Sequence, residues 1–275
     1  MNFILANCKQ GQKKIGVECS PQILYKNLLK YINKDLSQNI NVHHKFFNNN
    51  EGYNMIYNLY NNYNIINDNP VITLGGDHSV SIGSCQAFID KYKDDAHIIW
   101  IDAHTDINTY KTSDSGNIHG MVVSQLMGFD DPLILNKQYN LKPEQITYLG
   151  PRSIDEGEQK IIDEHNIKIY SCENIKKLGI FYILQEIQEK IKKKKIHISF
   201  DIDVFDPYYV QSTGTVVENG LNPFEIYTIL KYICQNNPIS SCDFVEFNPL
   251  LSDQKNMVKT LLYMNKSMEH VLKNI

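Results

Sequence analysis

Two apolar runs in this chain end directly in clusters of acids and histidine, and this pattern constrains the fold more than any other. Run 98–101 leads into Asp102-Ala103-His104-Thr105-Asp106, and run 196–200 leads into Asp201-Ile202-Asp203. A third apolar run ends in Gly75-Gly76-Asp77-His78-Ser79. Burying acids beside apolar strands is costly unless cations compensate them. The three segments therefore predict a common metal site at the ends of three strands.

Apolar, strand-like runs alternate with helix-like segments along most of the chain. This rhythm favours an α/β fold, a three-layer α/β/α sandwich around a mostly parallel sheet. No Pro- or Gly-rich linker and no internal repeat divides the 275 residues, so a single catalytic domain over 1–275 is expected. Strands are expected at 3–7, 70–75, 97–102, 145–150, 167–170, 196–201 and 241–246, and helices near 21–34, 79–93, 118–128, 155–165, 180–194, 223–236 and 253–272.

The segment 47–69 is rich in Asn and Tyr. Its composition is compatible with a low-complexity loop. We prefer a helix, because Met55, Ile56, Leu59 and Tyr60 are spaced to form one apolar face.

Charge and cysteine content narrow the class of protein. The net charge is −4 with a pI near 6.1, and the only basic run, 192–195, is short; no nucleic-acid partner is expected. None of the six cysteines forms a CxxC pair, which favours reduced thiols in a cytosolic protein. The N-terminus does not resemble a signal peptide, and no uncharged stretch approaches the ~20 residues of a membrane span. We therefore expect a cytoplasmic protein with no membrane partner.

The acids and histidines have the chemistry of a dinuclear metal site. Residues two apart on an extended segment point the same way, so Asp102 and His104 share a face, as do Asp201 and Asp203. Oxygen donors with some nitrogen suit Mn²⁺, and Fe²⁺ or Co²⁺ less well. Four carboxylates also balance two divalent cations. The expected ligands are His78, Asp102, His104, Asp106, Asp201 and Asp203.

Each of these residues taken alone could equally be a turn or cap residue. Their joint placement at strand exits favours metal binding. A metal pair can deprotonate a shared water and so supply a hydroxide nucleophile. Metallophosphoesterases also use two metals, but the segments GDxxD and GNH[DE] that they require do not occur here.

Three blocks of this chain, 75–79, 102–120 and 199–215, resemble the ureohydrolase family and, within it, the arginases. The resemblance implies a binuclear manganese site with two Mn²⁺ per chain and hydrolysis of a guanidinium group to release urea. It implies that His78, Asp102, Asp106 and Asp201 hold one metal. It implies that Asp102, His104, Asp201 and Asp203 hold the other.

The arginase branch is favoured by the polar residues after Asp106. In arginases the residues matching Asn108, Ser115 and Asn117 bind the substrate α-carboxylate, and Ser113 assists where many arginases carry Thr. Neutral donors satisfy a carboxylate without changing the charge balance of nearby metals. The implied substrate is therefore L-arginine, and the products are L-ornithine and urea.

The resemblance assigns four more residues. Asp155 would bind the substrate α-amino group, although it could equally be a helix N-cap. Glu246 would hold the guanidinium, Thr215 would line the same pocket, and His119 would act as proton shuttle. The bridging hydroxide would attack the guanidinium carbon while Asp106 accepts a hydrogen bond from it.

Two departures and two alternatives accompany this interpretation. Ser153 stands where an Asp is common, and 216–220 lacks the Pro and paired Gly usual in the family. A sister enzyme such as agmatinase is one alternative, and a non-catalytic binding or regulatory subunit with this fold is the other.

Family members commonly assemble, so we expect a homo-oligomer, a trimer or hexamer.

Overall fold

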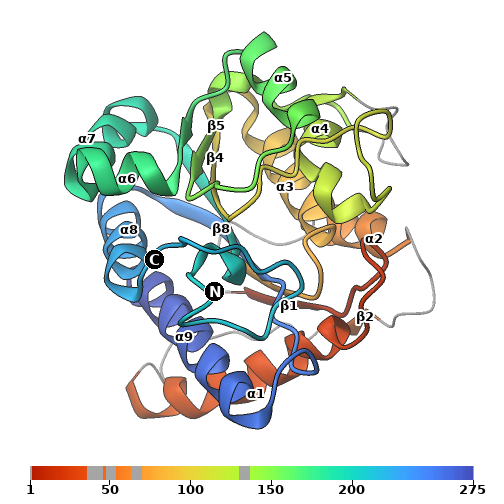
Figure 1. Cartoon of the computed structure of the whole chain (residues 1–275), viewed down its shortest axis with the longest axis vertical. Helices are drawn as coiled ribbons and strands as arrows, with labels where there is room; N and C mark the ends of the chain where they lie inside the picture. The colour runs from red at the N-terminus through yellow and green to blue at the C-terminus, as the bar shows by residue number, and fades with distance from the viewer. Residues whose placement is uncertain (1, 36–45, 48–53, 64–69, 130–136, 275) are drawn as a thin grey trace.

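A computed structural model describes residues 2–35, 46–47, 54–63, 70–129 and 137–274 of the chain. Its centre is an eight-stranded sheet in the order β2-β1-β3-β8-β7-β4-β5-β6 (Figure 1). Every neighbouring pair is parallel. The strands are β1 (Asn2–Ala6), β2 (Phe46–Phe47), β3 (Val71–Gly75), β4 (Ala96–Ile101), β5 (Ile146–Leu149), β6 (Ile169–Tyr170), β7 (Lys195–Asp201) and β8 (Ile239–Val245).

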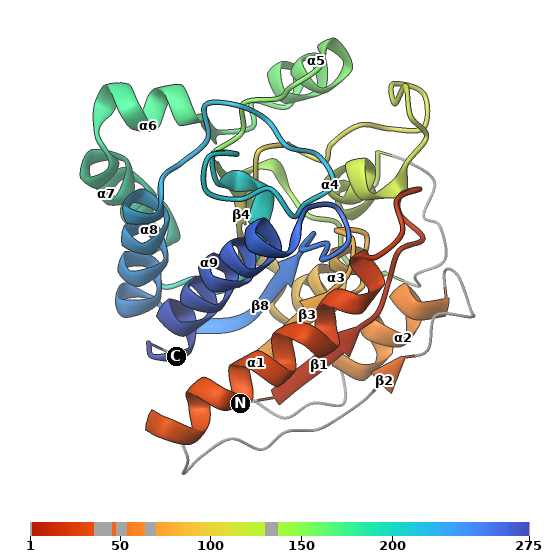
Figure 2. The same cartoon turned by 60° about the horizontal axis from the view of Figure 1, so that its bottom comes forward.

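Helices cover both faces of this sheet, as the sequence predicts (Figure 2). Alternate residues of each strand point to opposite faces: Ile99 and Ile101 join one apolar cluster, and Ile98 and Trp100 join the other. The first cluster includes α1 (Ser20–Asp35), α6 (Cys172–Leu178), α7 (Ile180–Ile191), α8 (Pro223–Asn236) and α9 (Gln254–Leu272). The second includes α2 (Asn54–Tyr63), α3 (Val80–Tyr92), α4 (Val122–Met127) and α5 (Glu156–Glu164).

The predicted elements match the observed ones closely. Each predicted strand and helix has a counterpart, and the preferred helix in 47–69 is confirmed as α2; its flanks 48–53 and 64–69 lie outside the described residues. The prediction missed β2 and α6. Both are too short for a periodic pattern, and α6 is recognisable mainly by the capping box of Ser171 and Asn174. In the part of the chain that the structure describes, no helix is long and apolar enough to cross a membrane.

A cluster of buried polar side chains around Asp243 links strands β7 and β8 to helix α3. Asp243 Oδ2 lies 3.3 Å from His197 Nε2 and accepts hydrogen bonds from Ser81 Oγ (2.8 Å) and Ser84 Oγ. His197 Nδ1 lies 2.6 Å from Ser241 Oγ. Burial alone would raise the pKa of Asp243, but the charge and hydrogen bond of His197, with the two serines, hold it below its ordinary value. The ionised Asp243 therefore stabilises the packing of these three elements.

The variant Asp243→Asn should lower the free energy of unfolding by about 1.5–3 kcal/mol, because it replaces the ionised acceptor of two buried serine hydroxyls with a neutral amide. The folded-state pKa is depressed, so this stabilisation is present above the unfolded pKa of about 3.9 and is lost as the pH falls through the folded value. Wild type and variant should therefore converge in acid. Denaturant unfolding at several pH values measures this, with the exposed Asp94→Asn as control. A cost independent of pH would contradict the explanation that the ionised Asp243 carboxylate stabilises the fold.

Candidate metal centre

The carboxyl ends of the four central strands β3, β8, β7 and β4 carry the predicted site. Ligands of parallel α/β sheets bind at this edge. His78 follows β3, Asp102 follows β4, Asp201 ends β7, and Asp203 lies two residues further on. Glu246 follows β8 directly. Segments more than 160 residues apart along the chain thus meet at one edge, as in the His78 N–H bond to Glu246 Oε1 (2.8 Å).

One half of the site surrounds the Nδ1 atom of His78. This atom lies 3.1 Å from Asp102 Oδ2, 3.1 Å from Asp106 Oδ2 and 3.2 Å from Asp201 Oδ2. His78 is 1% exposed, and its Nδ1 has no hydrogen-bond partner of good geometry. A buried, unpartnered imidazole nitrogen facing carboxylate oxygens fits a divalent cation.

The other half surrounds the Nδ1 atom of His104. This atom lies 3.1 Å from Asp203 Oδ2 and 3.4 Å from Asp102 Oδ1. Asp102 thus directs one oxygen to each histidine, as a shared ligand would. For Asp201, Oδ2 faces His78 while Oδ1 accepts the N–H of Asp203 (2.8 Å). Its sharing between two metals stays a prediction.

Crowding of the carboxylates shifts their ionisation in the protein alone. Burial and the charge of Asp102 raise the pKa of Asp106 to about 6. Burial, together with Asp203 and Asp102, raises the pKa of Asp201 well above its ordinary value. Burial would lower the pKa of His78, but its three carboxylate partners raise it well above its ordinary value. Two imidazoles do not neutralise four carboxylates, and the donor set fits divalent cations.

Two neighbours fix the orientation of the His78 ring. Its Nε2 lies 2.8 Å from Ser199 Oγ, and with Nε2 as donor the Nδ1 lone pair faces the carboxylates. The ring stacks on Trp100 at a centroid distance of 4.3 Å and an interplanar angle of 6°. Trp100 Nε1 in turn donates to Asp102 Oδ2 at 3.1 Å. The only tryptophan of the chain therefore contacts two candidate metal ligands.

Two site residues have a left-handed backbone, which side chains other than glycine rarely adopt. Asp106 has φ 49° and Glu246 has φ 63°. Such conformations persist only where the surroundings enforce them. The Asp106 carbonyl accepts the N–H of Val123 (2.8 Å), and the Glu246 N–H donates to the carbonyl of Gly76 (2.8 Å). These bonds turn both carboxylates toward the site.

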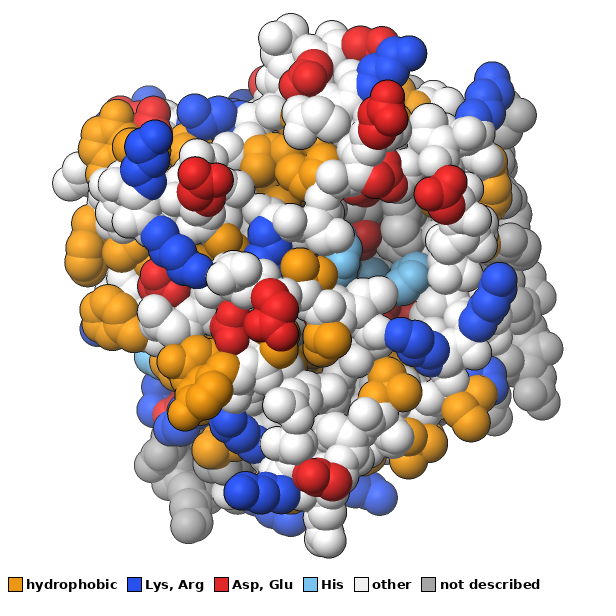
Figure 3. Space-filling model, in the orientation of Figure 1, with side chains coloured by type: hydrophobic (Ala, Val, Ile, Leu, Met, Phe, Trp, Pro, Cys, Tyr) orange, Lys and Arg blue, Asp and Glu red, His pale blue; other side chains and the backbone are white. Residues whose placement is uncertain are grey.

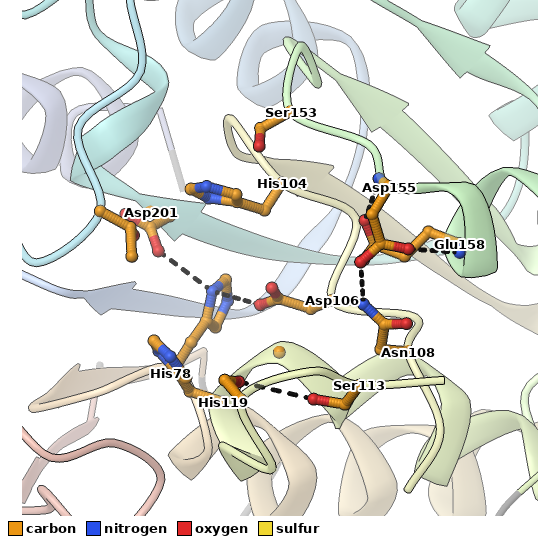
Figure 4. A pocket seen from close by; sticks show the side chains of 13 residues that line it. His78, His104, Asp106, Asn108, Ser113, His119, Ser153, Asp155, Glu158 and Asp201 are labelled. Atoms are coloured by element: carbon orange, nitrogen blue, oxygen red, sulfur yellow. Dashed lines mark hydrogen bonds and ion pairs between the residues drawn. The ribbon is translucent and has the colours of Figure 1, made fainter. Parts of the chain in front are cut away.

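A pocket opens from the metal-ligand group to the surface, and histidines are visible in its hollow (Figure 3). Most of the predicted substrate residues line it. The close view shows the side chains converging from several loops (Figure 4). The lining residues are His78, His104, Asp106, Asn108, Ser113, Ser115, His119, Gly120, Ser153, Asp155, Glu158, Asp201 and Thr215.

Four predicted site residues lie outside this lining: the candidate metal ligands Asp102 and Asp203, and the predicted substrate residues Asn117 and Glu246. Glu246 lies behind His119, whose Nδ1 is 3.0 Å from Glu246 Oε1. Asn117 lies in the same loop as Ser115, whose Oγ accepts the Asn117 N–H (3.1 Å). Thr215 lines the pocket and also donates to Asp203 Oδ2 (3.0 Å).

The far wall of the pocket contains Glu158, which the sequence prediction missed. Asp155 caps α5 by accepting the Glu158 N–H (2.9 Å), while Glu158 Oε2 accepts the Asp155 N–H (3.2 Å). Asp155 also accepts a hydrogen bond from Asn108 Nδ2 (2.7 Å). Both proposed roles of Asp155, cap and pocket residue, are compatible with this geometry. Burial raises the pKa of Glu158 to about 7. The capping-box spacing of the two acids was the available signal.

Comparison with known proteins gives consistent matches over nearly the whole chain. The sequence model of the Arginase family matches residues 6–271. An arginase of Staphylococcus aureus (strain COL) is 36% identical over 265 residues, covering 88% of this chain and 87% of that protein. An arginase of Bacillus caldovelox is 38% identical over 188 residues, covering 66% of this chain and 62% of that protein.

Solved structures agree. Entamoeba histolytica arginase in complex with L-ornithine has a TM-score of 0.88 and 29% identity, covering 98% of this chain and 97% of the other. Bacillus subtilis arginase has a TM-score of 0.88 and 31% identity over the same shares. The α/β fold with its central parallel sheet is thus that of the arginases. The chain belongs to the arginase family and is an arginase-type hydrolase.

Proposed function

We propose that this chain hydrolyses L-arginine to L-ornithine and urea at a site that holds two Mn²⁺ ions. The observation that carries the proposal is the pair of histidine–carboxylate groups joined through Asp102. Ligands of both groups line one pocket, together with the acids Asp155 and Glu158 and the neutral polar side chains of Asn108, Ser113, Ser115, Ser153 and Thr215. The ornithine complex of the Entamoeba arginase, which has the same fold, supports the product assignment.

The metal ligands would divide between the two ions as follows. His78 and Asp106 would bind one ion, His104 and Asp203 the other, and Asp102 and Asp201 both. When bound, the two ions lower the pKa of a shared water and supply a hydroxide nucleophile near neutral pH. Asp106 belongs to the ligand group and also lines the pocket. In the proposed mechanism its carboxylate would accept a hydrogen bond from this hydroxide.

Substrate recognition would use the opposite wall of the pocket. Neutral donors of Asn108, Ser113, Ser115 and Asn117 would bind the α-carboxylate, and Asp155 would bind the α-amino group. Glu158 lies beside Asp155 and lines the same wall. Ser153 also lines the pocket, so the departure at this position lies where it can affect amine recognition.

Glu246 and His119 would exchange partners during binding. In the free protein they form a 3.0 Å ion pair. A substrate guanidinium would take the place of His119 beside Glu246. Burial alone would lower the pKa of His119, but the hydrogen bond and charge of Glu246 raise it to about 9. Release from Glu246 would lower this pKa and favour transfer of the proton to the leaving amine.

We further propose a single catalytic domain over 1–275, a cytoplasmic location and a homotrimer or homohexamer. One continuous sheet from β1 to β8 supports the single domain. The absence of a spanning helix among the described residues is compatible with the location.

Metal binding can be measured through Trp100. Addition of Mn²⁺ to metal-stripped protein should quench its fluorescence, because the ring stacks on His78 and donates to Asp102. Equilibrium dialysis should give two ions per chain, and a chelator should restore the signal. The variant Asp203→Asn should retain the fluorescence response but bind one ion tightly. Fewer than one ion per chain in wild type would instead favour a non-catalytic binding protein.

Substrate choice can be tested with Asn108→Ala. Loss of a hydrogen bond to a charged group costs about 1.5–3 kcal/mol. The value of kcat/KM for arginine should therefore fall roughly 10- to 100-fold. Turnover of agmatine, which lacks the α-carboxylate, should not change. Urea release from arginine and from agmatine is the assay, with formamide release from formiminoglutamate measured separately. Mn²⁺-loaded wild type that released urea only from agmatine would establish the agmatinase alternative.

The His119–Glu246 pair has a pH signature. In metal-stripped Glu246→Gln the pKa of His119 should fall from about 9 toward 6.5 or lower, because burial is no longer offset by the carboxylate. At pH 8 the imidazole should thus be protonated in wild type and neutral in the variant. NMR titration of the ring measures this, with Glu158→Gln as control. An unchanged value would show that other acids determine the charge of His119.

A further inference from the structure

Arg152 is the only arginine in the chain. It follows β5 two residues after Gly150, and its guanidinium lies among backbone carbonyls. The shortest contacts run from Nη2 to Asp203 O (2.8 Å) and to Val217 O (2.8 Å). The remaining carbonyl contacts are to Phe205 (3.1 Å), Glu218 (3.1 Å), Val204 (3.2 Å) and Gly150 (3.5 Å).

All of these carbonyls except that of Gly150 belong to two loops of the candidate site. One loop follows β7 and contains Asp203. The other contains Thr215 and the segment 216–220, which departs from the family pattern. The two loops run side by side, with Leu221 N donating to Val204 O (3.1 Å) and Asp206 N to Leu221 O (3.0 Å). Arg152 lies between them and bonds to both.

Arg152 also joins these loops to the other metal-binding segment. Its own backbone N–H donates to the carbonyl of Ala103 (2.9 Å), between Asp102 and His104. The N–H of Ala103 donates in turn to Asp203 Oδ1 (3.2 Å). The backbone of Asp203 is therefore held by the guanidinium, and its carboxylate by Ala103 and Thr215.

We propose that Arg152 is a positioning residue that holds Asp203 opposite His104 and so determines the affinity of that half of the metal site. The inference rests on the proposed dinuclear site. Arginine suits the role because its planar fork presents five N–H donors that stay charged at all relevant pH values. Lysine would supply the charge, but three donors on one nitrogen cannot replace the contacts that Nε, Nη1 and Nη2 make to six carbonyls. Partners that orient ligands without binding the metal typically change affinity 10- to 100-fold.

The test compares Arg152→Lys and Arg152→Met with Lys176→Met. Lys176 Nζ donates to Asn219 O (3.0 Å), so it contacts the same departing segment through one exposed bond. Each metal-stripped protein is titrated with Mn²⁺ by equilibrium dialysis and Trp100 fluorescence. The unfolding midpoint without metal, and kcat and KM for arginine at saturating Mn²⁺, are measured in parallel.

In both Arg152 variants the Mn²⁺ dissociation constant that Asp203→Asn also raises should rise 10- to 100-fold. The other constant and the fluorescence response beside His78 should change less than threefold. Saturating Mn²⁺ should restore most of kcat in Arg152→Lys, and Lys176→Met should match wild type throughout.

Three results would overturn the inference alone: unchanged binding of both ions, equal weakening of both, or failure of both variants to fold, which would make Arg152 a purely structural residue. A weakening of the same size in Lys176→Met would also overturn it. Any disturbance of segment 216–220, and not the loss of the guanidinium in particular, would then weaken metal binding. Wild type that binds fewer than two ions would overturn the proposed function and this inference together.

Discussion

The concentration of negative charge at one edge of the sheet is the constraint on which the rest of this structure depends. Four carboxylates lie within a few ångströms of each other, almost fully buried, with two imidazoles between them. Such a group is unfavourable in an apolar interior unless positive charge enters it. This unfavourable crowding raises the pKa of Asp106 and Asp201 through burial and neighbouring carboxylates, and the carboxylates raise the pKa of His78. The fold therefore presents a site for which cations are the natural complement.

The protein holds this group in place through the backbone. The strands β3, β8, β7 and β4 end at the same edge, and each contributes a residue within two or three positions of its end. Close approach of loops completes the arrangement. A Cβ on Gly76 would lie 1.8 Å from the carbonyl of Cys8, so only glycine allows the turn that carries His78 to pack there. The left-handed conformations of Asp106 and Glu246 serve the same purpose at other loops.

The candidate metal ligands and the proposed substrate-binding residues are held in place by different parts of the structure. The candidate ligands are buried and held by strand ends, whereas Asn108, Ser113 and Ser115 belong to a longer, more exposed loop. That loop is tied to α5 by the Asn108–Asp155 bond, so two proposed recognition residues from separate segments hold one another in the free protein. The strand ends therefore determine where the charged ligands lie, whereas the composition of the loop would determine which substrate is bound.

The sequence alone determined the layered α/β fold, the strands and the residues at their ends, because apolar runs of strand length and the acids that follow them are local patterns. It also indicated the candidate metal ligands, since several such patterns occur together. Only the tertiary structure decided that Glu246 pairs with His119, that Glu158 faces the pocket, and that Arg152 bonds to the loops of Asp203 and Val217. These contacts join segments far apart in the chain. They use backbone groups, or side chains that already have another partner. No spacing rule in one sequence encodes them, because they depend on how the loops pack once the sheet has formed.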